Sequence, residues 1–284
     1  MRFGHARGEL SLDHTIVMGI LNRTPDSFFD GGRTGLEESV DHALRMVDEG
    51  AEVLDVGAVK AGPGAPVTPE EERERLLPLV ERLASTVAIP ISVETSRTEV
   101  AADAIAAGAA IVNDVSGLTD PELASVCARA GAGLVLMHHG GQLRGRPLNP
   151  RYEDVVGAVT EEWSRLSSLA EGAGVPRSSL LFDPGLDFGK NTFQSLELMR
   201  RLPELVRFGP VLIAASRKDI VGESLDLPVD ERLEGSLALV ALSVAGGAVM
   251  VRVHDVRASV RTTRMVEAVL GTRAPAAPIR GLWE

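Results

Sequence analysis

The feature that most constrains the fold is an eightfold alternation of short apolar runs with longer stretches of amphipathic helical spacing. The apolar runs are rich in Val, Ile and Leu and lack a strict polar–apolar alternation, which is typical of parallel strands buried on both faces. They span residues 15–20, 53–56, 89–93, 110–113, 133–137, 179–182, 211–214 and 249–253. This order predicts an α/β fold with a parallel sheet and right-handed crossovers.

Eight strand–helix units with no surplus favour a closed barrel. The length of 284 residues is close to the roughly 250 that are typical of a (β/α)8 (TIM) barrel. An open doubly wound sheet remains the alternative on the pattern alone. Because no linker or low-complexity segment divides the chain, we expect residues 1–284 to form a single domain. The Pro- and Ala-rich residues 271–284 are expected to form an irregular tail over the outside of the barrel.

Two helix starts are predicted from capping signals. Thr68 is followed by Pro69 and a run of glutamates, so Thr68 is expected to cap a helix. Ser96 and Glu99 have the spacing of a capping box ahead of an apolar helical face. Both helices would belong to the outer ring of the barrel.

Composition excludes several classes of partner and setting. The net charge is −11 and aromatic residues make up 4% of the chain, with no basic stripe, so we expect no nucleic-acid partner. The single cysteine, Cys127, lies in a predicted helix and is expected to be inert packing. The N-terminus lacks a signal-peptide core and no apolar run reaches the ~18 residues of a membrane span. We therefore expect a cytoplasmic protein without a membrane partner.

Polar residues stand at the end of every predicted strand. In chain order they are Asn22, Asp55, Glu94, Asn113 with Asp114, His138, Asp183, Ser216 to Lys218, and Arg252 with His254. One such residue alone would be most simply a solvated loop residue. Because barrel enzymes place their chemistry at the carboxyl ends of the strands, eight around one rim predict an active site.

The rim residues fall into two chemical sets. Glu94, Asn113 and Asp183 offer carboxylate and amide groups, which suit the edge of a heterocycle with donors and acceptors. The second set is cationic or able to bind a metal, and it suits a phosphate or pyrophosphate. Its members are Asn22, Lys218, Arg252 and His254. A planar heterocycle that carries a pyrophosphate would use both sets.

The segments that carry these residues resemble the dihydropteroate synthase family along nearly the whole chain. The similar segments are MGILNRTPDSFFDGG at 18–32, NDVSG at 113–117, MH at 137–138, DPGLDFGK at 183–190, SRK at 216–218 and RVHDV at 252–256. Several motifs in the same order on the expected strands make the resemblance specific. It implies a barrel of the folate pathway that condenses 6-hydroxymethyl-7,8-dihydropterin pyrophosphate with p-aminobenzoate, commonly as a homodimer.

The resemblance also implies roles for individual residues. The catalytic set would be Asn22, Asp183, Lys218 and Arg252. The pterin would be held by Glu94 (in place of a family aspartate), Asn113, Met137, Asp183, Phe188 and Lys218. The phosphates would be held by Asn22, Arg252 and His254, with Asn22 also helping to hold Mg²⁺. The region of the second substrate would include Phe28, Pro63 and Asp219.

The sequence departs from the family pattern mainly where the second substrate is expected. Residues 55–64 read DVGAVKAGPG where the family usually has DVGGESTRPG, so Lys60-Ala61-Gly62 replaces Ser-Thr-Arg. After the seventh strand, Asp219 replaces a serine that would receive the carboxylate of p-aminobenzoate. An aspartate at a helix start fills the helix's anion site itself and repels an incoming carboxylate. Pairing with Arg217 would soften that repulsion.

Three more positions differ. Arg23 and Phe29 replace small family residues, and Arg23 with Lys60 would be candidates to restore the lost positive charge. Glu94 is one methylene longer than aspartate, which leaves open whether it reaches the pterin or crowds it. We therefore expect a chain that binds pterin pyrophosphate but has weak or lost condensation with p-aminobenzoate. The alternatives are a fully active dihydropteroate synthase and, less favoured, a methyltetrahydrofolate-type pterin methyltransferase.

Overall fold

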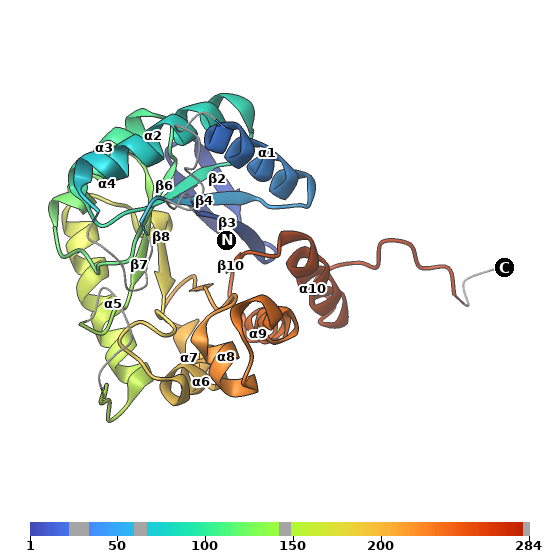
Figure 1. The fold of residues 1–284 in the computed structure, drawn as a ribbon. Helices are drawn as coiled ribbons and strands as arrows, with labels where there is room; N and C mark the ends of the chain where they lie inside the picture. The colour runs from blue at the N-terminus through green and yellow to red at the C-terminus, as the bar shows by residue number, and fades with distance from the viewer. Residues whose placement is uncertain (23–33, 60–66, 142–148, 281–284) are drawn as a thin grey trace.

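The computed structural model describes residues 1–22, 34–59, 67–141 and 149–280, and within them eight parallel strands form a barrel (Figure 1). The strands are β3 (Ile16–Asn22), β4 (Val53–Gly57), β5 (Ile91–Glu94), β6 (Ile111–Asp114), β7 (Gly133–Met137), β8 (Leu180–Asp183), β9 (Leu212–Ile213) and β10 (Met250–Val253). Their order is β8-β7-β6-β5-β4-β3-β10-β9, and a parallel bridge between Phe182 and Val211 joins the two end strands. The predicted barrel is confirmed, and the open sheet is wrong.

The helices form a ring around the strands (Figure 1). They are α1 (Thr34–Asp48), α2 (Pro69–Thr86), α3 (Thr98–Ala106), α4 (Glu122–Ala130), α5 (Val155–Gly172), α6 (Thr192–Arg200), α7 (Leu202–Leu205), α8 (Asp219–Leu225), α9 (Leu233–Ala245) and α10 (Val256–Val269). Short 3-10 turns cover Arg177–Ser179 and Val229–Glu231. Each long helix therefore returns the chain to the amino end of the next strand.

One predicted helix start is confirmed and the other is wrong. Thr68 and Glu71 form a reciprocal capping box at the start of α2. At α3, Ser96 does not serve as the cap: the N-cap residue is Arg97, whose side chain caps nothing. The backbone N–H of Arg97 donates to Thr95 Oγ1, and its guanidinium bonds to Glu72 of α2. Turn formation by Thr95 and the contact with α2 thus delay the helix start.

The amino end of the barrel is closed by a hairpin that the sequence pattern did not predict. Strands β1 (Arg2–His5) and β2 (Gly8–Ser11) pair antiparallel. Phe3 is fully buried and packs with the residues inside the barrel, including Met18 and Val135. A Cβ on Gly133 would lie 2.4 Å from the Phe3 ring, so glycine permits this close approach. Because this end is plugged, the carboxyl end of the barrel is the accessible one.

The chain after α10 has no helix or strand over residues 271–280, as expected of an irregular tail. It is almost wholly exposed, and Figure 1 shows it leading away from the barrel rather than over its outside, which corrects that expectation. Pro and Ala in this segment offer too little apolar surface to hold it against the helices.

Cys127 lies buried in α4 as a free thiol. Burial raises its pKa to about 12, so the thiol stays protonated and unreactive, as predicted. In the part of the chain that the structure describes, no helix combines the length and the apolar character that crossing a bilayer requires.

Candidate active site

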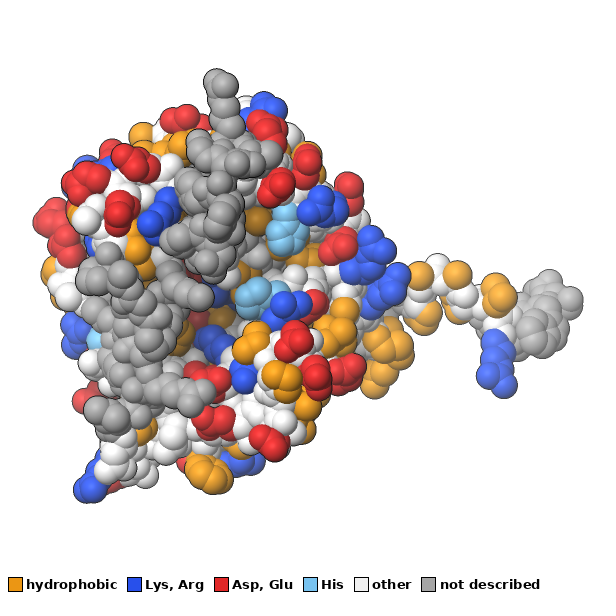
Figure 2. Space-filling model, viewed as in Figure 1, with side chains coloured by type: hydrophobic (Ala, Val, Ile, Leu, Met, Phe, Trp, Pro, Cys, Tyr) orange, Lys and Arg blue, Asp and Glu red, His pale blue; other side chains and the backbone are white. Residues whose placement is uncertain are grey.

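The rim at the carboxyl ends of the strands brings the predicted polar residues together. Figure 2 shows basic, acidic and histidine side chains next to one another near the centre of this face. Two groups of contacts can be separated within the rim. One surrounds Arg252 and the other surrounds Lys218.

Arg252 of β10 is held between two carboxylates that reach it from neighbouring parts of the barrel. Its Nε donates to Asp55 Oδ2 at 2.6 Å, and its Nη2 donates to Glu94 Oε2 at 2.5 Å. Asp55 is fully buried, while the side chains of Glu94 and Arg252 are 12% and 13% exposed. Ser92 Oγ also donates to Asp55 Oδ1 at 2.5 Å. We call Asp55, Glu94 and Arg252 the arginine triad.

The electrostatics of the arginine triad follow from burial and from mutual attraction. Burial alone would lower the pKa of Arg252, but the Asp55 and Glu94 carboxylates outweigh it and hold that pKa above its ordinary value. Burial raises the pKa of Glu94, and the charge of Arg252 opposes that rise. The guanidinium therefore remains charged, and its charge is already countered inside the protein.

Asn113 of β6 is hydrogen-bonded to the arginine triad and has one side-chain atom without a partner among the described residues. Its Nδ2 donates to Asp55 Oδ2 at 3.2 Å, and the residue is 3% exposed. Among the described residues, Asn113 Oδ1 is the buried side-chain oxygen or nitrogen that lacks a hydrogen-bond partner. Because an unsatisfied buried acceptor is costly, this oxygen marks a position where a ligand N–H would be accepted.

The second group surrounds Lys218, which precedes α8. Its Nζ donates to the carbonyl oxygen of Leu186 at 3.0 Å and lies 4.8 Å from the centroid of the Phe188 ring. Asp183 at the end of β8 accepts from the N–H of Gly185 at 2.7 Å. Burial lowers the pKa of Lys218 while the nearby Asp183 opposes this, and burial raises the pKa of Asp183 while Lys218 opposes that.

A buried lysine that had no assigned role holds the loop beneath this group. Lys190 Nζ lies 2.8 Å from His138 Nδ1 and donates to the carbonyls of His138, Gly185 and Phe188. Burial lowers the pKa of Lys190 to about 7 and that of His138 to about 3. Gly185 has φ +65°, and a Cβ there would lie 2.1 Å from the His138 carbonyl oxygen. Lys190 thus fixes the loop that presents Phe188.

Met137, expected beside the pterin ring, ends β7 and is buried under the same loop. Its Cγ lies 3.3 Å from where a Cβ of Gly185 would stand.

Asp114, at the end of the neighbouring strand β6, stabilises a loop of its own. Its two carboxylate oxygens accept from the backbone N–H groups of Ser116 and Leu118, so it organises the loop after β6.

The segment between β9 and α8 is fixed by ion pairs. Arg217 forms two hydrogen bonds with Asp255, at 2.7 and 3.1 Å, and Arg232 donates to Asp219 Oδ1 at 3.3 Å. The cation shown beside Asp219 is therefore Arg232, whereas Arg217 is engaged with Asp255. A second carboxylate, Asp187, accepts from the N–H of Ile220 at 2.9 Å. Two acidic side chains thus occupy the start of α8.

His254 and Asn22 complete the predicted phosphate set. His254 Nδ1 lies 3.1 Å from Ser216 Oγ, and burial lowers its pKa to about 4, with the charge of Arg252 acting in the same direction. At neutral pH it is an uncharged ligand. Asn22 ends β3 beside Gly57, and its side-chain oxygen lies 3.6 Å from where a Cβ of Gly57 would stand.

Several predicted positions of the second-substrate side fall outside the described residues. They are Arg23, Phe28, Phe29, Lys60, Ala61, Gly62 and Pro63. The hypothesis that Arg23 and Lys60 supply positive charge therefore stays a prediction. Asp219 is the member of the predicted second-substrate set that the structure places.

Sequence reasoning missed three residues that organise the rim. Asp55 was noted at a strand end but given no role, although an acidic residue inside an apolar run must find a buried partner. Lys190 was given no role. Asp187 carried no signal beyond its place in the DPGLDFGK segment.

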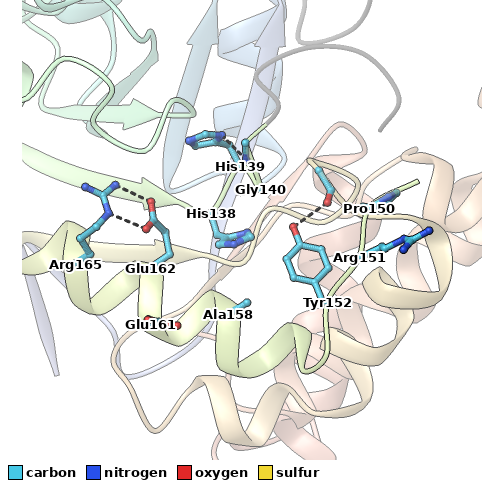
Figure 3. Close-up of a pocket in the computed structure, with 12 residues that line it drawn as sticks. His138, His139, Gly140, Pro150, Arg151, Tyr152, Ala158, Glu161, Glu162 and Arg165 are labelled. Atoms are coloured by element: carbon cyan, nitrogen blue, oxygen red, sulfur yellow. Dashed lines mark hydrogen bonds and ion pairs between the residues drawn. The ribbon is translucent and has the colours of Figure 1, made fainter. Parts of the chain in front are cut away.

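A separate hollow of about 700 Å³ lies beside the rim, between the segment after β7 and α5 (Figure 3). His138, His139 and Tyr152 line one side, and the ion-paired Glu162 and Arg165 of α5 line the other. Tyr152 donates to the carbonyl oxygen of Gly189. None of Glu94, Asn113, Asp183, Lys218 and Arg252 lines this hollow, so it is distinct from the two groups around Arg252 and Lys218.

Comparison with known proteins shows the family to which the chain belongs. Residues 18–254 match the family model described as pterin binding enzyme. The chain is 47% identical over 281 residues to inactive dihydropteroate synthase 2 of Mycobacterium leprae, covering 96% of this chain and 97% of that protein. It is 40% identical over 267 residues to dihydropteroate synthase of Escherichia coli, covering 93% and 95%.

A solved structure shares the fold over nearly its full length. This is dihydropteroate synthase from Xanthomonas albilineans in complex with 7,8-dihydropteroate, with a TM-score of 0.83 and 40% identity. The alignment covers 95% of this chain and 97% of that one.

Proposed function

The chain belongs to the pterin-binding enzyme family, with dihydropteroate synthases among its relatives, and from this premise we propose a specific activity. It binds 6-hydroxymethyl-7,8-dihydropterin pyrophosphate at the rim and condenses it with p-aminobenzoate slowly or not at all. The observation that carries the proposal is the convergence of Asp183, Asn113 and Lys218 on one rim whose amide oxygen, Asn113 Oδ1, lacks a partner among the described residues.

The ring end of the ligand would be bound by hydrogen bonds and stacking. A pterin edge presents N–H donors, which suit the Asp183 carboxylate and Asn113 Oδ1. Lys218 would donate to a ring acceptor while Phe188, already beneath its ammonium group, packs against the ring face. Asp183 would also favour a ring that carries developing positive charge as the pyrophosphate departs.

The phosphate end would use His254, Asn22 and the Arg252 nitrogen that neither Asp55 nor Glu94 binds. Departure of pyrophosphate needs positive charge placed where negative charge accumulates. Asn22 would help to hold Mg²⁺ at this end through its amide oxygen, with pyrophosphate oxygens as the other ligands, because Mg²⁺ prefers oxygen ligands and is often held chiefly by substrate phosphates. Bound there, the metal would neutralise charge on the leaving group. His254, neutral at pH 7, would donate one hydrogen bond rather than add a charge.

The weak condensation follows from the start of α8. Asp219 and Asp187 place two carboxylates where the carboxylate of p-aminobenzoate is expected. Repulsion between like charges at ~4 Å is about 1–4 kcal/mol, depending on the local dielectric. Inactive dihydropteroate synthase 2 of Mycobacterium leprae, at 47% identity, supports the same direction.

A fully active synthase remains the second candidate, because Arg232 neutralises part of the charge of Asp219. The two side chains lie 3.3 Å apart, and Arg232 is 9% exposed, so this pair is shielded from solvent. If Arg232 cancelled the repulsion, p-aminobenzoate would bind and react at an ordinary rate.

We also propose a cytoplasmic homodimer. Leu242 of α9 and Met265 and Val269 of α10 are each more than half exposed, and the two helices pack against each other. Figure 2 shows apolar side chains gathered on this side of the molecule. Contiguous exposed apolar surface of this kind is typical of a subunit interface. Light scattering with size-exclusion chromatography tests it: a mass near 60 kDa, twice the chain mass of 30.1 kDa, is expected.

The proposed activity is tested by calorimetry combined with a pyrophosphate-release assay in the presence of Mg²⁺. We expect saturable heat on titration with the pterin pyrophosphate, and little release of pyrophosphate when p-aminobenzoate is added. Rapid release that depends on p-aminobenzoate supports the fully active synthase instead. Absence of pterin binding contradicts both.

A further inference from the structure

We propose that Glu94 determines how strongly the site holds an anionic tail, because it occupies the guanidinium of Arg252 that would otherwise meet the pyrophosphate. The inference rests on the proposed function and adds the class of ligand that the rim prefers. The site should accept an uncharged pterin readily and should discriminate against its diphosphate ester.

Glu94 and Arg252 come from strands that are not neighbours in the barrel. Glu94 ends β5 and Arg252 lies on β10, and β4 and β3 separate these strands in the barrel. The contact of 2.5 Å between Glu94 Oε2 and Arg252 Nη2 therefore reaches across the mouth of the barrel. Asp55 of β4 takes the opposite position on the guanidinium at Nε. Two of the three guanidinium nitrogens are thus committed to carboxylates.

The length of the Glu94 side chain decides whether its contact with Arg252 can form. A shorter aspartate on the same backbone would place its carboxylate about 1.5 Å further from Arg252, the length of one C–C bond. At that separation the hydrogen bond to Nη2 would be lost, because such bonds require about 2.7–3.2 Å. The extra methylene of Glu94 thus creates the contact, while the contact with Asp55 does not depend on it.

The net charge of the arginine triad affects how closely a diphosphate can approach. The arginine triad holds two carboxylates and one guanidinium, so an approaching diphosphate meets a net negative group where a single pair of Arg252 with Asp55 would be neutral. To bind Arg252 through Nη2, the diphosphate would have to displace Glu94 and leave that carboxylate buried without a partner. An uncharged pterin meets neither cost. The discrimination therefore arises at the tail and not at the ring.

The experiment compares two ligands with two variants of the full chain. Calorimetry measures the Kd of 6-hydroxymethyl-7,8-dihydropterin and of its diphosphate for the wild type, Glu94→Gln and Glu94→Asp. The readout is the ratio of the two Kd values, because a change in ring contacts or in folding alters both Kd values alike. We expect both variants to shift the ratio in favour of the diphosphate by about tenfold or more.

Glu122→Gln is the matched control, since it removes one carboxylate from an exposed position in the first turn of α4 and should leave the ratio unchanged. A ratio that stays within twofold of the wild type in both Glu94 variants overturns this inference while the proposed function stands. If neither ligand binds the wild type or any variant, the proposed function fails, and the inference fails with it.

Discussion

The two cations of the rim have opposite surroundings, although both stand at the carboxyl ends of neighbouring strands. Lys218 contacts a backbone carbonyl and an aromatic face, so its charge remains available to a ligand. Arg252 is held by Asp55 and Glu94, so its charge is already balanced within the protein. A rim can therefore keep the residue types of a binding site and still change which part of the ligand it favours.

The difference has a structural origin in what each cation must satisfy. The loop after β8 offers backbone carbonyls, and Lys190 beneath it already binds two of them together with the carbonyl of His138 after β7. Around Arg252, by contrast, the neighbouring strands offer two buried carboxylates, each of which needs a cation. The cation of the ring end thus makes its direct contacts with neutral groups, with the charge of Asp183 nearby, whereas the cation of the tail end is bonded to two carboxylates.

The largest expected effect is a difference in the free energy of unfolding between variants that lack one or the other cation. Arg252→Met leaves Asp55 and Glu94 buried without their cation, and the free energy of unfolding should fall by about 3–5 kcal/mol. Lys218→Met removes a hydrogen bond to one carbonyl and should cost much less, about 1 kcal/mol. Urea denaturation measures both. Equal losses in the two variants would show that the contrast between the two cations is wrong.

The next effect concerns the ring end alone. Asp183→Asn replaces an acceptor by a group that also donates, so both the uncharged pterin and its diphosphate should bind about 30- to 100-fold more weakly. Calorimetry with both ligands tests this, with the exposed Asp230→Asn in the turn Val229–Glu231 as control. A loss confined to the diphosphate would place Asp183 at the tail instead.

A smaller effect is expected from pH. The pKa of His254 is lowered from 6.5 to about 4, so the unfolded chain binds a proton below pH 6.5 that the folded chain does not. Its contribution to stability is full above pH 6.5 and is lost as pH falls towards 4. His254→Asn should therefore lessen the fall in unfolding free energy between pH 7 and 5 by about 1–2 kcal/mol. The same pH slope in wild type and variant would mean that the pKa of His254 is not lowered in the folded chain.

The smallest effect lies at the start of α8. Asp219→Ser removes one carboxylate, but Arg232 already balances part of its charge, so the gain in p-aminobenzoate affinity should be about 1 kcal/mol, or roughly fivefold. Titration of p-aminobenzoate into protein saturated with 6-hydroxymethyl-7,8-dihydropterin and inorganic pyrophosphate measures it. Unchanged affinity would mean that another part of the rim weakens the binding of p-aminobenzoate.

Most of the fold could be predicted because each parallel strand is short, apolar and buried on both faces. The strand expected at 133–137 has those bounds in the structure, and the one expected at 211–214 is reduced to Leu212–Ile213. The hairpin of β1 and β2 was missed because its buried content is little more than Phe3 among polar residues. Its stability comes from the barrel interior, which no local pattern reveals.

The members of the site could be predicted, but their partners could not. Strand ends mark which side chains meet at a rim, so Asn113, Asp183 and Arg252 were all expected there. The Glu94–Arg252 contact joins residues 158 positions apart across a closed barrel, and its existence depends on one methylene. Likewise, Arg217 was considered as a partner of Asp219, but it bonds with Asp255, 38 residues further along the chain.

The account is tested most directly by a crystal structure of the protein with 6-hydroxymethyl-7,8-dihydropterin pyrophosphate. We predict the ring hydrogen-bonded to Asp183 and to Asn113 Oδ1 and packed on Phe188, with Glu94 and Asp55 still bonded to Arg252. A ring bound in any other cavity, or Asp183 and Asn113 left without ligand contacts, would contradict the claim that this rim is a pterin site.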